Sequence, residues 1–152
     1  MDDELKREII LENYSNPSNY GTVNDSSYDK FNTNNESCVD NLNFYIKIED
    51  NVIKDLKFEG EACAISKSSS SIFTDNVIGK TIDEAISYIN EFEKMIDQKE
   101  YSEDTLKDAC CFCDIYKQNN RRNCAYLPYR GLKKYLENYI NKWYINTCKA
   151  II

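Results

Sequence analysis

Three cysteines and one aspartate occupy positions at which they could hold a metal ion. Cys38 and Asp40 lie just ahead of a predicted strand. Cys63 lies between a strand and a helix, and Cys124 precedes the last predicted helix. Loops can converge at one end of a sheet, and a helix N-terminus favours the thiolate form of cysteine. Three thiolates and one carboxylate can complete a tetrahedral Zn²⁺ site without histidine.

The cysteine and histidine counts narrow the chemistry. The chain has 152 residues with seven cysteines and no histidine. Without histidine there is no Ser-His-Asp triad, no Cys-His pair and no imidazole metal ligand. An odd number of cysteines argues against a complete disulfide framework, so the thiols are metal ligands, reactive groups or buried fillers. Spacing alone does not exclude that these cysteines only fill the core, because isolated cysteines often behave as small buried apolar residues.

The charge balance excludes other classes of function. The chain carries 26 acidic and 19 basic residues, a net charge of −7. This balance argues against sequence-independent binding to nucleic acid, which requires attraction to phosphates. The first ten residues are charged, unlike a signal peptide, and no apolar run is long enough to span a membrane. We therefore expect a cytoplasmic protein with reduced thiols and no membrane partner.

The apolar pattern predicts an α+β fold in a single domain, residues 1–152. Alternation in residues 42–49 and 52–58 predicts two strands joined by a turn at Asp50 and Asn51. The other expected elements are a weak edge strand at 28–31, helices at 2–14, 64–78, 81–96 and 102–115, a basic connector at 117–123, and a last helix that begins near Pro128 and packs through Trp143. This order predicts a small antiparallel sheet packed against helices.

The remaining cysteines are expected to be structural. Cys110, Cys111 and Cys113 include a Cys-x-x-Cys spacing, which can mark a redox or metal pair. One such pair lacks two further ligands, and the neighbouring Phe112 favours a packed helical face. We therefore expect these three thiols to fill the core, whereas Cys148, near the end of the sequence, has no expected role.

Four segments follow patterns that recur together. Residues 10–21 follow hydrophobic-x-x-x-Tyr-x-x-Pro-x-Asn-x-Gly, and residues 38–40 read Cys-Val-Asp, close to Cys-Gly-Asp. Residues 58–71 are similar to Phe-x-Gly-x-Gly-Cys-Ala-Ile-Ser-x-Ala-Ser, and residues 121–127 follow Arg-x-x-Cys-Ala-x-Leu. In this order the segments resemble the IscU, NifU N-terminal and SufU family of iron–sulfur cluster assembly. The resemblance covers nearly the whole chain and favours a site over buried fillers.

Within that family the chain is most similar to the SufU branch. IscU-type scaffolds carry a histidine directly before the third cysteine, where this chain has Asn123. SufU-type proteins carry an insertion between the second and third cysteines. The stretch from Cys63 to Cys124 is long enough to hold that insertion.

The resemblance implies a function and a set of site residues. SufU-like proteins bind zinc and accept persulfide sulfur from a SufS-type cysteine desulfurase, which they relay toward iron–sulfur assembly proteins. Cys38 would be the sulfur acceptor. Lys67 and Arg121 would lie beside the site and offset its negative charge. The implied zinc ligands are Cys38, Asp40, Cys63 and Cys124.

Two alternatives remain at this point. One is a scaffold on which a [2Fe–2S] cluster is assembled, because the same three thiols could ligate iron. The other is a zinc-stabilised binding module without transfer activity. It is suggested by Val39 and Ala62, which replace two family glycines. Glycine often supplies a positive φ that a β-branched residue tolerates poorly, so Val39 could reshape the loop that carries Asp40.

Overall fold

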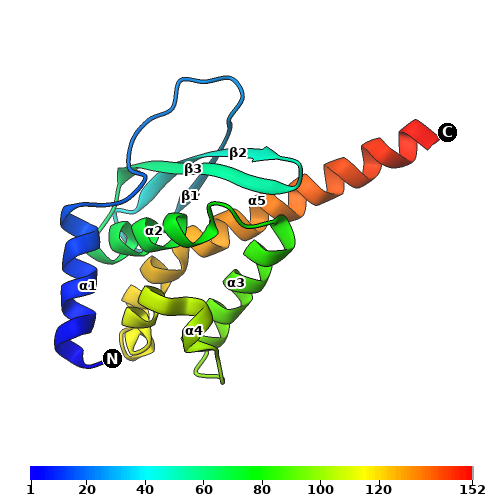
Figure 1. Cartoon of the computed structure of the whole chain (residues 1–152). Coiled ribbons are helices and arrows are strands. Elements are labelled where there is room, and N and C mark those ends of the chain that lie inside the picture. Colours follow the sequence, from blue (N-terminus) through cyan, green and yellow to red (C-terminus); the bar gives the residue numbers. More distant parts are fainter. Residues whose placement is uncertain (152) are drawn as a thin grey trace.

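The sheet is built on one hairpin, as its alternating pattern predicts. In the computed structural model, which describes residues 1–151, β2 (Asn41–Glu49) pairs antiparallel with β3 (Val52–Glu61) (Figure 1). Leu42 and Phe44 are fully buried on one face of β2. Asp50 and Asn51 have φ angles of 52° and 63°. Two left-handed residues in sequence form the type I′ turn that suits a twisted hairpin.

The edge strand is longer than its sequence indicates. β1 (Asp29–Asn34) pairs antiparallel with β2, so the strand order is β1-β2-β3. Its residues are mostly polar and lack the apolar alternation that predicts a strand. Thr33 is nevertheless buried and donates a hydrogen bond of 3.3 Å to the carbonyl of Leu127. Tertiary contacts with the last helix therefore extend a strand that was expected only at residues 28–31.

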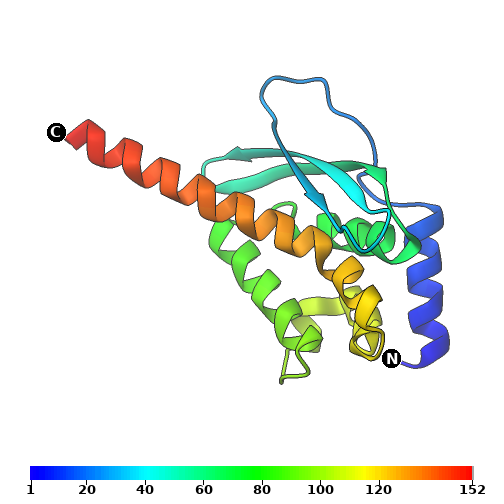
Figure 2. The same cartoon turned by 180° about the vertical axis from the view of Figure 1, so that it is seen from behind.

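The helices gather on one side of the sheet, and the end of the last helix extends beyond it (Figures 1 and 2). A shared core of apolar side chains, among them Phe73, Phe92 and Leu132, joins them to β2 and β3. The prediction of an α+β fold with a small antiparallel sheet is confirmed. The helical elements are α1 (Asp3–Ser15), α2 (Ala64–Val77), α3 (Ile82–Ile96), α4 (Glu103–Leu106), the 3₁₀ segments η1 (Lys107–Phe112) and η2 (Ile115–Lys117), and α5 (Asn119–Ile151).

Two predictions for the second half of the chain are wrong. Residues 102–115 form a short helix followed by 3₁₀ turns rather than one amphipathic helix. The expected connector at 117–123 belongs largely to α5, and Pro128 lies inside that helix instead of beginning it. Proline removes the N–H that would bond to the carbonyl of Cys124. The helix continues through this defect because Tyr129 and Leu132, directly after it, are fully buried.

The far end of α5 also differs from expectation. Trp143 was expected to pack against other helices, but 62% of its surface is exposed, and Tyr144 beside it is 66% exposed. Figures 1 and 2 show why, because this part of the helix extends past the sheet and the other helices. Within residues 1–151, no helix is both long and apolar enough to cross a lipid bilayer.

Gly60 allows β3 to continue to the site, and its replacement should cost stability. Its φ is +128°, and a β-carbon there would lie 2.3 Å from the carbonyl oxygen of Asn41. Gly79 also has a positive φ, +89°, but open space around it. We expect Gly60→Ala to lower the free energy of unfolding by about 3 kcal/mol, because strain and overlap add. Gly79→Ala should cost about 1 kcal/mol from strain alone. Urea unfolding measures both values, and equal losses would contradict the role of the close approach.

Candidate metal centre

The loop between β1 and β2 carries the first two side chains of the site. The N–H of Asn35 donates to the carbonyl of Asp40, and the N–H of Cys38 donates to the carbonyl of Asn35, both at 3.0 Å. These bonds fold the loop back on itself. Val39 is 64% exposed, whereas Asp40 is only 2% exposed. Consecutive side chains thus point in opposite directions, and the carboxylate turns into the protein.

The two residues that replace family glycines, Val39 and Ala62, do not disturb the loop that carries Asp40. Val39 and Ala62 are absent from the non-glycine residues that have a positive φ in the described chain. The loop therefore holds Asp40 inward without the backbone strain that a β-branched residue would suffer in the left-handed region. The concern that Val39 displaces the carboxylate has no support in this structure.

Cys63 is the N-cap residue directly before α2 and is hydrogen-bonded to Asp40. Its φ and ψ, −69° and 169°, are those of an N-cap residue, and its sulfur accepts from the N–H of Ser66 at 3.5 Å. The N–H of Cys63 donates to Asp40 Oδ1 at 2.8 Å, and its Sγ lies 3.9 Å from Asp40 Oδ2. The hydroxyl of Ser66 donates to the same Oδ2. The carboxylate is thus held by two groups at the start of the helix.

Cys124 reaches the group from within α5 rather than from a loop ahead of it. It is 1% exposed, and its Sγ lies 3.6 Å from the carbonyl oxygen of Asn120, one turn earlier. The side-chain amide of Asn35 donates to this sulfur at 3.5 Å. The loop between β1 and β2 and the beginning of α5 therefore meet at Cys124.

The four predicted ligand residues come together in the fold. One donor atom from each of Cys38, Asp40, Cys63 and Cys124 lies within 4.8 Å of the others. Around Zn²⁺, sulfur at about 2.3 Å and oxygen at about 2.1 Å place neighbouring donors about 3.6 Å apart. A small contraction of the group would reach that geometry, and the donor set is one that zinc prefers. The residues present therefore fit zinc.

Burial divides the group into a closed and an open side. Asp40 and Cys124 are buried, whereas Cys38 and Cys63 are half-buried. Cys38 lies on the loop beside the exposed Val39. It is therefore the thiol best placed to meet a second protein, while the other two thiols are fixed by helices.

Burial, hydrogen bonds and neighbouring charges shift the pKa values of three side chains at the site. Burial opposes ionisation of Asp40, but hydrogen bonds from Ser66 and the N–H of Cys63 outweigh it, so its pKa is lowered. Burial, with the nearby Asp40, raises the pKa of Cys124 far above its usual range. A metal cation would reverse this effect, since metal-bound thiols lose their protons. The pKa of Arg121 is raised, chiefly because its guanidinium lies near the charge of Cys63.

The two basic residues expected beside the site differ in position. Arg121 lies close enough to the group for the charges of Cys63, Cys124 and Cys38 to act on its guanidinium. Lys67 is one turn into α2 from Cys63, but its ammonium lies over the rings of Tyr20 and Tyr14, 4.8 Å and 5.4 Å from their centroids. Its contacts are cation–π contacts at the edge of the site.

Sequence reasoning missed two residues that support the group. Asn35 contacts Cys124 and closes the loop, and Ser66 holds Asp40. Ser66 had a usable signal, because a polar residue three positions after an N-cap often bonds back to the cap. Asn35 had none, since its partner is distant in sequence.

Replacing Ser66 should weaken the site, and the same helix supplies a control. Ser66→Ala removes a hydrogen bond to a buried carboxylate, which we expect to cost about 2 kcal/mol of stability. Loss of a partner that orients a ligand should also weaken zinc binding about 10-fold. Ser70 is equally buried, but its hydroxyl has no partner among the described residues. Ser70→Ala should leave both quantities almost unchanged. Thermal unfolding and zinc competition with a chelator would measure them, and similar losses in both variants would refute this role.

Comparison with known proteins settles the family. Residues 5–142 match the NifU-like N terminal domain. This chain belongs to that family. One NifU-like relative, "Zinc-dependent sulfurtransferase SufU" of Bacillus subtilis (strain 168), is 36% identical over 133 residues, which cover 87% of this chain and 89% of the relative. "Iron-sulfur cluster assembly scaffold protein IscU" of Thermotoga maritima is 39% identical over 103 residues, covering 68% and 72%.

A solved structure supports the NifU-like fold independently. A crystal structure of a candidate iron–sulfur cluster assembly scaffold protein for the SUF system, from Fervidobacterium islandicum AW-1, superimposes with a TM-score of 0.77 at 29% identity. The match covers 88% of this chain and 97% of that one. The resemblance to the SufU and NifU-like family is therefore confirmed.

Proposed function

We propose that this protein is a zinc-dependent sulfurtransferase, which accepts persulfide sulfur from a SufS-type cysteine desulfurase and relays it to iron–sulfur cluster assembly. One observation carries the proposal, the histidine-free group of three thiols and Asp40 with Cys38 on its accessible side. The similarity to a relative named as a zinc-dependent sulfurtransferase supports it. The seven thiols suit a reducing compartment, so we place this function in the cytoplasm.

Within this proposal the residues divide the work. Cys38, Asp40, Cys63 and Cys124 would hold Zn²⁺, which keeps coordinating thiols deprotonated at neutral pH. Asp40 and Cys124 anchor the buried side, and Arg121 offsets the negative charge. Cys38 is the sulfur acceptor, because its loop can approach a partner protein.

The transfer step is thiol exchange. The thiolate of Cys38 attacks the outer sulfur of the desulfurase persulfide, and a new S–S bond forms at Cys38. The S–S bond on the desulfurase breaks, and its electron pair returns to the desulfurase cysteine, which takes up a proton. No external oxidant or reductant is required. The chain contains no histidine, so if a histidine were to take the place of Cys38 as a metal ligand and release its thiol, that histidine would have to come from the desulfurase.

The test uses the zinc-loaded protein with a SufS-type desulfurase and cysteine. We expect desulfurase turnover to rise, and mass spectrometry to find one additional sulfur on the peptide that contains Cys38. A persulfide confined to another cysteine, or unchanged turnover, would refute the proposal. The zinc content of the freshly purified protein, measured first, should be close to one ion per chain.

A scaffold function is the second candidate, since a relative named as an IscU scaffold is 39% identical. The three thiols could ligate iron, but Asn123 stands directly before Cys124, where a histidine would favour this reading. Anaerobic reconstitution with iron and sulfide separates the two candidates. A stable cluster that transfers to an acceptor protein would favour the scaffold, whereas rapid loss of the visible absorption would favour sulfur transfer.

A further inference from the structure

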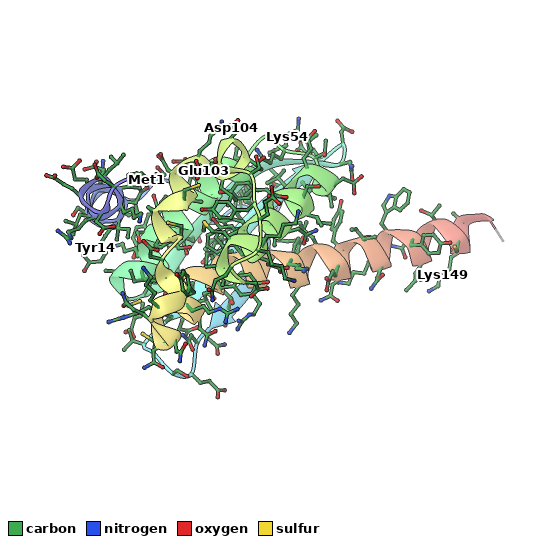
Figure 3. The ribbon with its side chains drawn as sticks, turned by 90° about the horizontal axis from the view of Figure 1, so that it is seen from below. Met1, Tyr14, Lys54, Glu103, Asp104 and Lys149 are labelled. Carbon is green, nitrogen blue, oxygen red and sulfur yellow. The ribbon has the colours of Figure 1, made fainter. Side chains whose placement is uncertain are left out.

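A second group of thiols lies outside the metal centre, on the segment between α4 and α5. Cys110 and Cys111 are buried in the core, as expected, whereas Cys113 is only half-buried. Cys110 and Cys113 line a surface cavity of about 460 Å³. Cys111 does not line it. Figure 3 shows three other lining residues, Met1, Glu103 and Asp104, on the same side of the molecule.

The local backbone places Cys110 and Cys113 above one another. η1 is a 3₁₀ segment, and the N–H of Cys113 donates to the carbonyl of Cys110 at 3.0 Å. The φ and ψ of Cys113, −61° and −24°, continue this geometry. Side chains three residues apart eclipse in a 3₁₀ helix and are separated by about 6 Å along its axis. Both thiols therefore face the cavity from one side.

This separation suits a bridging cation better than a disulfide. A disulfide requires β-carbons about 4 Å apart. The backbone would have to move to bring the β-carbons of Cys110 and Cys113 that close. A cation with a sulfur about 2.3 Å away on each side spans a wider gap. The pair lacks the ligands of a zinc site, because within residues 1–151 no third carboxylate or thiol joins Cys110 and Cys113 in a cluster that could hold a metal ion, although Glu103 and Asp104 line the same cavity.

The charged side chains around Cys110 and Cys113 also favour a bound cation. Burial first, and then the charge of Glu103, raises the pKa of Cys110 to about 11. This thiol is protonated at neutral pH and is a poor sulfur acceptor, whereas a thiophilic cation can displace its proton. Lys6 lies 2.5 Å from Asp114 and also interacts with the charge of Cys113. It could offset the negative charge of two thiolates.

We propose that Cys110 and Cys113 form a second metal site, which takes the soft monovalent cation Cu⁺. Soft thiolate ligands select Cu⁺, and two sulfurs satisfy its low coordination number. Two S–H bonds break and two Cu–S bonds form, with two protons released and no change of oxidation state. The site is separate from the group at Cys38, and it does not depend on the proposed sulfur transfer.

The test titrates the zinc-loaded full chain with Cu⁺ under anaerobic conditions against a chromogenic Cu⁺ chelator, and bound copper and released zinc are both measured. We expect the first equivalent of Cu⁺ to bind without zinc release. Cys113→Ser should lose this equivalent and keep its zinc, whereas Cys148→Ser, which changes an exposed thiol elsewhere, should behave like the unchanged protein. Retention of the equivalent in Cys113→Ser would overturn the proposal. Release of one zinc per copper in the unchanged protein would also overturn it.

A second measurement needs no variant. The unchanged protein is alkylated with and without one equivalent of Cu⁺, and the modified peptides are mapped by mass spectrometry. We expect Cu⁺ to protect Cys113, and Cys110 to the extent that it reacts. Protection of Cys38 or Cys148 with Cys113 still reactive would show that copper binds elsewhere, and the proposal would fail even if Cys113→Ser did not fold.

Discussion

Cys38→Ser should abolish sulfur acceptance and lower desulfurase activation by roughly 100-fold or more, as expected when a nucleophile is removed. A serine hydroxyl is not ionised at neutral pH and cannot take the persulfide sulfur. Desulfurase turnover, with the mass of the chain after reaction, measures the effect. The chain should still fold, because the side chain of Cys38 is half-buried and its loop is closed by backbone hydrogen bonds.

Two controls separate chemistry from structure in this prediction. Cys148→Ser removes a thiol that is exposed and distant in sequence, and it should retain full activity. Val39→Ala changes the neighbouring exposed side chain without touching a thiol. Normal activation by Cys38→Ser would contradict the proposed function and favour a zinc-stabilised binding module, which should be indifferent to this change.

Asp40→Ala should cause the largest loss of metal affinity among carboxylate changes. Structural zinc sites bind with about 10–16 kcal/mol, so one of four ligands contributes on the order of 3 kcal/mol. The affinity for zinc should therefore fall by about 100- to 1000-fold. The variant also leaves the N–H of Cys63 and the hydroxyl of Ser66 without their partner, which destabilises the start of α2.

The control for Asp40→Ala lies in the same loop. Glu36 is an exposed carboxylate between β1 and β2, and Glu36→Ala should leave zinc affinity within about 2-fold, as surface changes have small effects. Chelator competition gives both affinities. If Asp40→Ala binds zinc as tightly as Glu36→Ala does, the carboxylate is not a ligand and the metal is held by the three thiols with water.

The sequence predicted what local patterns determine. Alternating residues predicted β2 and most of β3, and the helix expected at 81–96 is α3. Its N-cap is Thr81, whose hydroxyl accepts from the N–H of Glu84 at 3.2 Å. The four site residues could be named because their spacing resembles a family, not because spacing alone brings them together. Their convergence needs contacts between residues far apart in the chain, as between Asn35 and Cys124.

The failures have physical causes of the same kind. Pro128 is a reasonable signal for the beginning of a helix, but packing of the residues that follow it keeps the helix continuous through the proline. Trp143 is a large apolar residue of the kind that usually packs against other helices. It is exposed because this part of α5 extends past the core. The polar β1 is stabilised by pairing and by burial of Thr33, neither of which alternation reveals.

The group at Cys38 draws its side chains from three parts of the chain, the loop after β1, the first residue before α2 and the second turn of α5. A metal bound there is a cross-link across the tertiary structure, and it closes long loops that are entropically costly in the unfolded chain. The sheet cannot separate from α2 and α5 while all four ligands remain bound. Assembly of the group at Cys38 therefore reports on assembly of the whole domain. Under the proposed function, a partly unfolded chain would offer a desulfurase scattered thiols in place of a sulfur acceptor.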